Sequence, residues 1–248
     1  TIGATHLALR SKDAAIIPAS DRALTFSGRA AATIPPGAVL FSDPVELTVA
    51  PLAELAISLY LPKESTTSAH LFGEHTAYLS KEGDFTGSAE ITDATTSLSY
   101  YWLAGIDVLG AAEAATIVAF GDSITDGHGS MPNTDHNWPS FFAKRLQRDK
   151  RTAKFGVVNV GISGNQVLRD GGGVLGGMSA LARLERDVLM QPGAKFVLLM
   201  EGINDLSGRT RQPDANVRDA RHQSSGLPRL GAICVPQSHQ FICSGCQL

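Results

Sequence analysis

The sequence predicts an α/β protein whose parallel sheet is preceded by a β-sandwich-like domain, and changes of pattern along the chain support this fold class. Residues 1–110 contain short runs of alternating apolar and polar residues separated by turn residues, which is typical of a β-sandwich. In residues 116–207 the pattern becomes apolar strand, loop and amphipathic helix, which is typical of a parallel sheet covered on both faces. The alanine-rich segment 111–115 is predicted to be a hinge, and residues 208–248, which show neither period, are predicted to be an irregular tail.

The composition argues against several functional classes. Hydrophobic residues make up 43% of the 248-residue chain and charged residues 18%, which is typical of a globular protein that buries a core. The net charge of −3 and the lack of a basic stretch argue against a nucleic-acid partner. No run approaches the roughly 18 apolar residues of a membrane helix, so no membrane span is expected. The oligomeric state is not indicated by the sequence.

The all-β prediction rests on one long alternating run and on several shorter ones. Leu55, Ile57, Leu59 and Leu61 recur at every second position, as in a half-buried strand. Shorter strands are predicted at 7–9, 24–26, 39–41, 77–79 and 98–103. Turn-forming residues separate these runs, at 35–37, 42–44, 62–63 and 81–83. Short strands at this spacing favour a sandwich.

Residues 116–207 are predicted to contain strands at 117–120, 157–160 and 196–200 and two amphipathic helices. Asn137 is expected to cap a helix with Pro139 at its second position and an inner face formed by Trp138, Phe141, Phe142 and Leu146. A second helix is predicted from the helical spacing of Met178, Leu181, Leu184 and Val188. Ligands of parallel sheets bind beyond the carboxyl ends of the strands, so chemistry is expected in the loops that follow these strands.

Each of these loops contains a residue suited to nucleophilic or oxyanion chemistry. The first loop, 120–127, places Ser123 just after a strand, where Gly121 permits a sharp turn that exposes the hydroxyl group. The second loop, 159–165, and the third, 201–205, carry glycines that let a ligand approach the backbone. Asn204 in the third loop offers an uncharged amide donor for an oxyanion. Each segment alone also fits an ordinary turn, but their order on successive strands predicts one site.

These segments resemble the SGNH/GDSL-type esterase/lipase family of acylhydrolases. Gly-Asp-Ser-Ile at 121–124, Asn-x-x-Ile-Ser-Gly at 159–164 and Gly-x-Asn-Asp at 202–205 are similar to the first three sequence blocks of that family. The dipeptide at 138–139 is similar to a Trp-Pro pair in the first helix of many members. The segment at 18–26 resembles part of the β-domain that precedes the hydrolase in a two-domain bacterial and fungal subgroup.

The resemblance implies a flavodoxin-like parallel sheet, present here in incomplete form, and a serine mechanism. Ser123 would be the nucleophile, and the backbone N–H groups of Ser123 and Gly164 and the side chain of Asn204 would form the oxyanion hole. It implies no cofactor and no metal.

The family takes its general base from an Asp-x-x-His segment near the end of the domain, and this chain departs from that pattern. Serine needs such a base because an unassisted hydroxyl is a weak nucleophile at neutral pH. Asp219 and His222 match the segment by letter but follow the Gly-x-Asn-Asp block closely, so a working pair and a coincidence both stay open. His239 has no acidic neighbour, and His128 and His136 are expected at the substrate rim or in solvent, so no base is assigned.

Both ends of the chain have features that bear on its completeness. The chain is expected to be a truncated family member in which the residues after about 208 do not encode the ancestral sequence. This expectation rests on the irregular pattern of that segment, which also holds all three cysteines. An odd, clustered cysteine count is no disulfide framework; Cys234, Cys243 and Cys246 are interpreted as thiols, with half a zinc site or a redox pair at Cys243 and Cys246 as the alternative. The chain begins with Thr1 and its first methionine is Met131, so an incomplete N-terminus is expected; secretion is a hypothesis and localisation stays unassigned.

Two functional hypotheses follow from these observations. The first is a carboxylic ester hydrolase that acts by acyl transfer through Ser123 on a small-molecule or carbohydrate ester. The second is a degenerate, non-catalytic hydrolase-like protein that binds carbohydrate or ester but lacks the Asp–His base. A histidine nitrogen within hydrogen-bond reach of Ser123 Oγ would favour the first.

Overall fold

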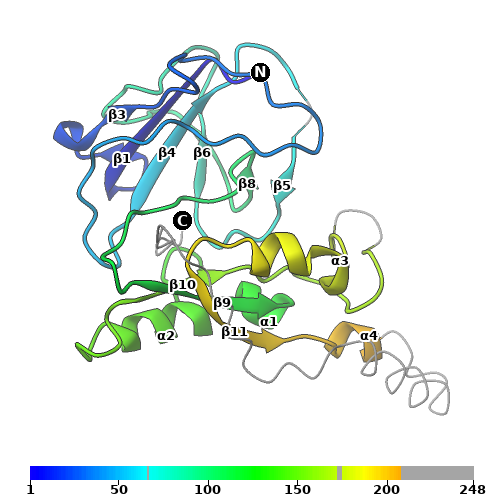
Figure 1. Ribbon diagram of the computed structural model, residues 1–248. Helices are drawn as coiled ribbons and strands as arrows, with labels where there is room; N and C mark the ends of the chain where they lie inside the picture. The colour runs from blue at the N-terminus through cyan, green and yellow to red at the C-terminus, as the bar shows by residue number, and fades with distance from the viewer. Residues whose placement is uncertain (66, 172–174, 208–248) are drawn as a thin grey trace. The chain divides into compact units, whose positions relative to one another are not determined.

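The computed structural model describes residues 1–65, 67–171 and 175–207 (Figure 1). The chain divides into two compact units between Ala104 and Gly105. This division does not by itself establish the predicted domain ranges 1–110 and 116–207, which stay predictions. The predicted tail, with its three cysteines, lies outside the described residues. Among the described residues, no helix combines the length and apolar character needed to cross a membrane.

The first unit is built around a four-stranded antiparallel sheet. Its long strand β1 (Ala4–Lys12) pairs with β4 (Leu55–Tyr60) in a register that runs from Ala4 opposite Tyr60 to Leu9 opposite Leu55. The short strands β2 (Ala15–Ile16) and β3 (Arg22–Ala23) also pair with β1, and the 3-10 helix η1 (Pro18–Ser20) connects them. Two further ladders join β5 (Ala69–His70) to β8 (Tyr100–Tyr101) and β6 (Ala77–Leu79) to β7 (Thr95–Ser97).

The predicted strands of this unit are confirmed in part. The runs at 7–9, 55–61 and 77–79 lie in β1, β4 and β6, whereas the run at 98–103 is divided between an exposed Leu98 and the short β8. The strand predicted at 39–41 is wrong, because this apolar run pairs with no strand of the described residues and Phe41 is 73% exposed. A β-sandwich is not confirmed by these small sheets and stays a prediction.

The strand predicted at 24–26 is also wrong, for a local physical reason. The strand β3 ends at Ala23, Leu24 N makes one more hydrogen bond to the Thr5 carbonyl oxygen at 2.8 Å, and Phe26 then closes a tight turn with Arg29. The carboxylate of Asp43 holds this turn by accepting hydrogen bonds from the Thr25 hydroxyl and from the backbone N–H of Gly28. Such hydrogen bonds between a side chain and the backbone stabilise the turn in place of the hydrogen bonds that would continue the strand.

The second unit contains the predicted parallel sheet. Its three strands are β9 (Ala115–Gly121), β10 (Phe155–Asn159) and β11 (Ala194–Met200), in the order β10-β9-β11. Both pairings are parallel, with Val118 of β9 opposite Val158 and Val197. Every residue of the central strand β9 is buried, which explains its continuous apolar sequence. The strands predicted from the sequence are therefore confirmed as adjacent and parallel.

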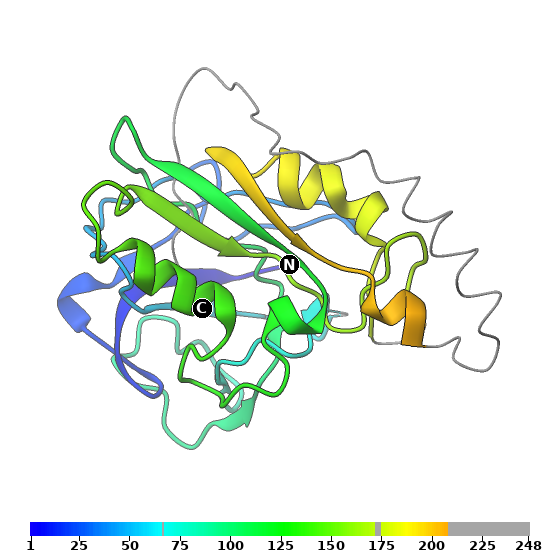
Figure 2. The same cartoon turned by 90° about the horizontal axis from the view of Figure 1, so that it is seen from below.

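Helices cover the two faces of this sheet (Figure 2). The helix α2 (Trp138–Leu146) packs with Phe142 and Leu146 on the face that carries Ile117 and Ala119. On the other face, α3 (Ala180–Leu184) continues into the π-helical turn η2 (Glu185–Leu189). Ala180 and Val188 of these elements pack on the face that carries Val118 and Phe120. Two short helices, α1 (Ser123–Asp126) and α4 (Ile203–Ser207), follow β9 and β11.

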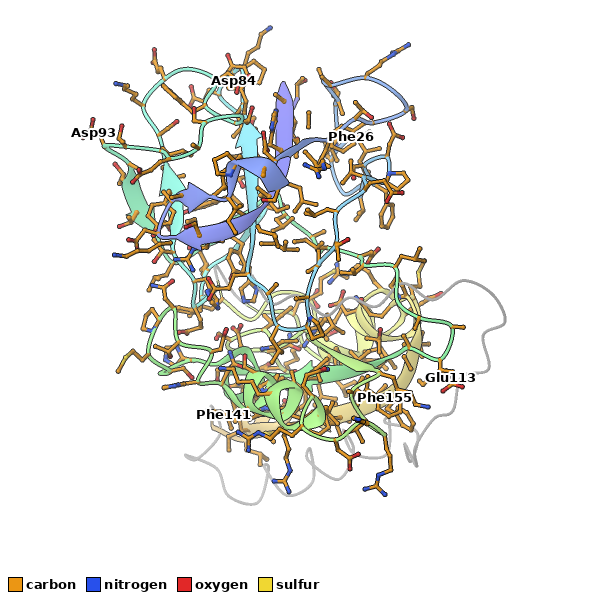
Figure 3. The ribbon with its side chains drawn as sticks, turned by 90° about the vertical axis from the view of Figure 1, so that its left-hand side faces the viewer. Phe26, Asp84, Asp93, Glu113, Phe141 and Phe155 are labelled. Carbon is orange, nitrogen blue, oxygen red and sulfur yellow. The ribbon has the colours of Figure 1, made fainter. Side chains whose placement is uncertain are left out.

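The first predicted helix is confirmed, with one correction on its inner face. Asn137 is the N-cap, its side chain accepts a hydrogen bond from Ser140 N at 2.9 Å, and Pro139 occupies the second position. Phe141 does not face the sheet: it is 54% exposed and stacks on His136 with ring centroids 5.5 Å apart (Figure 3). Because Trp138, Phe142 and Leu146 repeat every fourth residue, Phe141 lies about 100° away from their stripe.

The second predicted helix forms, but its inner face differs from the prediction. Ser179 caps the helix, so Met178 precedes it, and Leu181 is 43% exposed. Val188 is buried and Leu184 packs against the same cluster, as predicted, and Ala180 and Arg183 are buried as well. The helix therefore also buries an arginine, at a position that the apolar spacing did not predict as inward, and this arginine lies next to the candidate site.

Candidate active site

Ser123 is the first residue of α1, directly after the central strand β9. The turn before it is tight, because a Cβ atom on Gly121 would lie 2.2 Å from Thr125 Oγ1 and 2.4 Å from the Met200 carbonyl oxygen. The Asp122 side chain caps the helix by accepting a hydrogen bond from Ile124 N at 3.0 Å. Ser123 itself is partly exposed, so the strand-to-helix turn presents it at the end of the sheet.

The loop that carries Gly164 is fastened to the Ser123 loop by buried hydrogen bonds. Asp126 Oδ2 accepts from Ser163 N at 2.9 Å and from Ser163 Oγ at 2.6 Å. Asn159 Nδ2 donates to the Thr125 carbonyl oxygen at 2.8 Å. Gly164 has a φ of +82°, a left-handed conformation that favours glycine. The first two loops therefore form one hydrogen-bonded body.

The loop that carries Asn204 is fastened in turn to the Gly164 loop. Asn204 Nδ2 donates to the Asn165 carbonyl oxygen at 2.9 Å, which fixes the orientation of its amide group. Gln166 Nε2 donates to the Asn204 carbonyl oxygen at 3.1 Å. The buried carboxylate of Asp205 accepts from Val167 N at 3.0 and 3.1 Å. The residue next to Gly164 thus holds the side chain of Asn204.

The structure brings together the three loops that the sequence singled out, at the carboxyl ends of three adjacent parallel strands. The catalytic roles of Ser123, Gly164 and Asn204 remain predictions. The possible base residues Asp219, His222 and His239 lie outside the described residues. His128 and His136, which the sequence places at the rim or in solvent, are both exposed.

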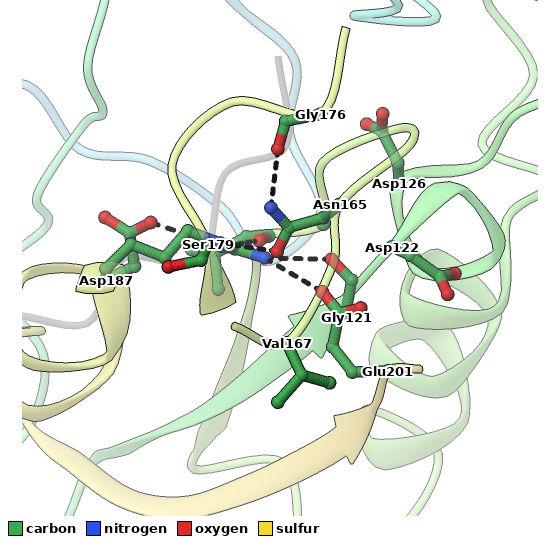
Figure 4. A network of polar contacts seen from close by, with 12 residues as sticks. Gly121, Asp122, Asp126, Asn165, Val167, Gly176, Ser179, Asp187 and Glu201 are labelled. Carbon is green, nitrogen blue, oxygen red and sulfur yellow. Dashed lines mark hydrogen bonds and ion pairs between the residues drawn. The ribbon is translucent and has the colours of Figure 1, made fainter. Parts of the chain in front are cut away.

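A buried cation that the sequence interpretation missed lies beside these loops. The Arg183 side chain is 0% exposed. Its partners Gly121, Asn165, Asp187 and Glu201 belong to the network of polar contacts in Figure 4. Its guanidinium carbon lies 4.1 Å from the centroid of the Phe120 ring. Burial lowers the pKa of Arg183, and the ion pairs with Asp187 and Glu201 act in the opposite direction. One feature of the sequence points to this residue: Arg183 lies three positions after Ala180, which places a charged side chain on the same face of the helix as an apolar one.

Glu201 is the second missed residue, and it is a carboxyl group in an unusual environment. Its side chain is 2% exposed, and Oε1 lies 3.4 Å from Arg183 Nη2. Its other oxygen, Oε2, is buried and has no hydrogen-bond partner within the part of the chain that the structure describes. Burial first, and then the nearby negative charge of Asp122, raise the pKa of Glu201 to about 7, although Arg183 acts in the opposite direction.

This raised pKa predicts that the contribution of Glu201 to the free energy of unfolding decreases between about pH 4.5 and pH 7. The folded protein holds the Glu201 proton more tightly than the unfolded chain, whose pKa is near 4.5, so this stabilisation is present below pH 4.5 and is lost as the pH rises through 7. We expect Glu201→Gln to remove a pH-dependent loss on the order of 1 kcal/mol across this range. Melting temperatures of the wild type and of Glu201→Gln at pH 4.5 and pH 8 measure it. Parallel pH profiles of the two proteins would contradict the prediction.

The chemistry that this arrangement can perform is that of a nucleophile beside hydrogen-bond donors. A hydroxyl group, a glycine backbone and a carboxamide lie in three connected loops, which is suited to attack on a carbonyl group and stabilisation of the resulting oxyanion. Among the described residues, no cluster of three or more histidine, cysteine, aspartate or glutamate side chains could hold a metal ion.

The match to a known protein family lies in the second unit. Residues 119–236 match the model of the GDSL-like lipase/acylhydrolase family, a range that extends beyond residue 207 and includes Asp219 and His222. The predicted truncation is not confirmed by this match. No curated protein matches the chain.

Solved structures of one esterase are similar to part of the chain. The crystal structure of AlinE4, a SGNH-hydrolase family esterase, is 22% identical over 48% of this chain and 55% of its own, with a TM-score of 0.33. Two mutants of the same esterase match at 20% and 22% identity, over 47% and 48% of this chain and 57% and 58% of theirs, each with a TM-score of 0.31. This chain therefore spans little more than half the length of the solved structures that it matches. The family match supports a hydrolase, and the segment 119–236 is similar to the GDSL-like lipases and acylhydrolases.

Proposed function

We propose that this protein hydrolyses carboxylic esters by acyl transfer through Ser123. The observation that carries the proposal is the hydrogen-bond chain that joins the three loops at the end of the parallel sheet. Asp126 binds Ser163 beside Gly164, and the Asn165 carbonyl oxygen binds the side chain of Asn204. Donors held in advance of the reaction stabilise a developing oxyanion without reorganisation, which is the main requirement of this chemistry.

In the proposed reaction, Ser123 Oγ attacks the carbonyl carbon of the ester while a base accepts the hydroxyl proton. The negative charge that develops on the carbonyl oxygen would be stabilised by the N–H groups of Ser123 and Gly164 and by Asn204 Nδ2. Collapse of the tetrahedral intermediate releases the alcohol, which takes up a proton, and leaves an acyl group on Ser123. Water then attacks the acyl-enzyme and releases the carboxylic acid.

The base and the substrate are the finer parts of the proposal. Asp219 and His222 are the residues that match an Asp-x-x-His segment, and a coincidental match is the alternative, so the test below includes His222. We propose a small ester as the substrate, with an acetylated carbohydrate as one class. The β-rich first unit would be the part of the chain that binds a glycan.

Hydrolysis of p-nitrophenyl acetate by the full chain tests the function. Without a confirmed base we expect slow turnover, and Ser123→Ala should reduce it to the rate without enzyme because the nucleophile is absent. Asn204→Ala should lower kcat more than it raises KM, because an oxyanion donor acts in the transition state. The matched control is Gln166→Ala, which changes a neighbouring amide that binds the Asn204 backbone and should change kcat less than Asn204→Ala does.

The outcomes separate the two functional hypotheses. Turnover that is lost in both Ser123→Ala and His222→Ala would identify His222 as the base. Equal turnover in the wild type and in Ser123→Ala would contradict the esterase proposal and favour the non-catalytic alternative, in which the loops bind a ligand without acylation.

A further inference from the structure

Arg183 donates to groups at the ends of all three strands of the parallel sheet. Nη2 donates to the carbonyl oxygen of Gly121, the last residue of β9, at 3.0 Å. Nη1 donates at 2.6 Å to the carbonyl oxygen of Val160, which follows β10. Nη2 also lies 3.4 Å from the carboxylate of Glu201, which follows β11. A single planar side chain therefore connects the points from which the three loops leave the sheet.

The remaining donors connect this group to the Gly164 loop and to its own helical segment. Nε donates at 3.0 Å to Asn165 Oδ1, and Nη1 donates at 3.2 Å to Asp187 Oδ2. Asn165 is fully buried, and its Nδ2 donates to the carbonyl oxygens of Gly176 and Met178 at 2.6 and 2.7 Å. Because a guanidinium group has five N–H donors, these five contacts use its whole hydrogen-bonding capacity.

We propose that Arg183 is a positioning residue that sets the relative placement of Ser123, Gly164 and Asn204. The inference rests on the function proposed above. Gly121 lies two positions before Ser123, Asn165 directly follows Gly164, and Glu201 lies three positions before Asn204. A displacement of Gly121, Asn165 or Glu201 would move the nucleophile or an oxyanion donor relative to the substrate carbonyl group. Catalytic groups lose about 100-fold in rate for a misplacement of roughly 1 Å, so such a residue affects turnover without touching the substrate.

Lysine is the replacement that separates charge from geometry at this position. Arg183→Lys keeps a cation beside Glu201 and Asp187, but one ammonium group cannot reach the separate acceptors that a planar fork reaches. We expect kcat for p-nitrophenyl acetate to fall about 30- to 100-fold while KM changes less than about threefold. The control is Val188→Ala, which loosens the buried interior of the same helical segment but removes no side-chain hydrogen bond to the three loops, and it should leave kcat within about twofold.

Hydrogen exchange gives a second measurement that does not depend on activity. In Arg183→Lys, the peptides that contain 159–165 and 201–205 should lose protection by about tenfold or more, whereas Val188→Ala should not change them selectively. If the wild type shows no Ser123-dependent turnover, the proposed function fails, and the exchange data alone then decide whether Arg183 positions these loops. Exchange and kcat that match the Val188→Ala control would overturn the inference.

Asn165→Ala keeps the inference testable if Arg183→Lys does not fold. This change removes the acceptor of Arg183 Nε but leaves the Asn165 carbonyl oxygen that binds Asn204. We expect a folded protein with the same selective loss of kcat, and where both variants fold, the double variant should lose little more than either alone. Unchanged kcat in Asn165→Ala, or full additivity of the two losses, would overturn the inference.

Discussion

Arg183→Met is expected to lower the free energy of unfolding by about 3 to 5 kcal/mol, measured by urea denaturation followed by circular dichroism at pH 8. The replacement leaves Glu201, which is 2% exposed, without its cation. It also removes a hydrogen-bond donor from the carbonyl oxygens of Gly121 and Val160. Breaking a buried ion pair from one side is costly because the other charge stays in a medium that solvates it poorly.

The chain offers a matched control for this measurement. Arg186 also pairs with Asp187, at 3.0 Å through Nη2, but its side chain is 56% exposed. Arg186→Met should therefore cost less than about 1 kcal/mol, because water replaces the lost partner. Adding Glu201→Gln to Arg183→Met should restore about 1 to 2 kcal/mol, since a neutral amide needs no cation. Equal losses for the two arginine variants would show that burial does not decide the strength of these pairs.

Phe120→Ala is expected to cost about 3 to 5 kcal/mol, whereas Phe141→Ala should cost less than about 1 kcal/mol. Phe120 is 2% exposed in the central strand, packs with Val118 and Val188, and carries the Arg183 guanidinium over its ring. Phe141 is 54% exposed and contacts His136 and Lys144 at the surface. The same urea titrations measure both variants. Comparable losses would mean that Phe141 faces the core, as its sequence pattern predicts, and that α2 is rotated relative to its position here.

The sequence alone predicted the part of the site that depends on short-range pattern. Ile117 to Phe120, Val157 to Val160 and Phe196 to Met200 are apolar runs of strand length, and each is followed by a loop with glycine, serine or asparagine. Parallel strands place their carboxyl ends together, so the proximity of the Ser123, Gly164 and Asn204 loops follows from topology without side-chain detail. The N-cap role of Asn137 could also be predicted, because helix capping depends only on residues that are neighbours in the sequence.

Residues whose role depends on distant partners could not be predicted in this way. The turn at Phe26 depends on Asp43, which lies outside the local run that predicted a strand. Phe141 and Leu181 are apolar, yet each lies away from the side of its helix that packs on the sheet and stays exposed. In the helix that contains Leu181, Arg183 turns inward because acceptors at the ends of three strands and in one loop converge there.

The sequence by itself determined the three strands of the parallel sheet, the order of the loops that follow them and the residue types available for chemistry, because these depend on periodicity, capping and turn preference within a few residues. Only the tertiary structure decided which polar groups support one another. The hydrogen bonds from Ser163 to Asp126 and from Asn204 to Asn165 join residues that are more than thirty positions apart. The ionisation of Glu201 likewise depends on burial and on Asp122, which lies on another strand–loop unit. Desolvation and charge pairing act through space, and a linear pattern does not record them.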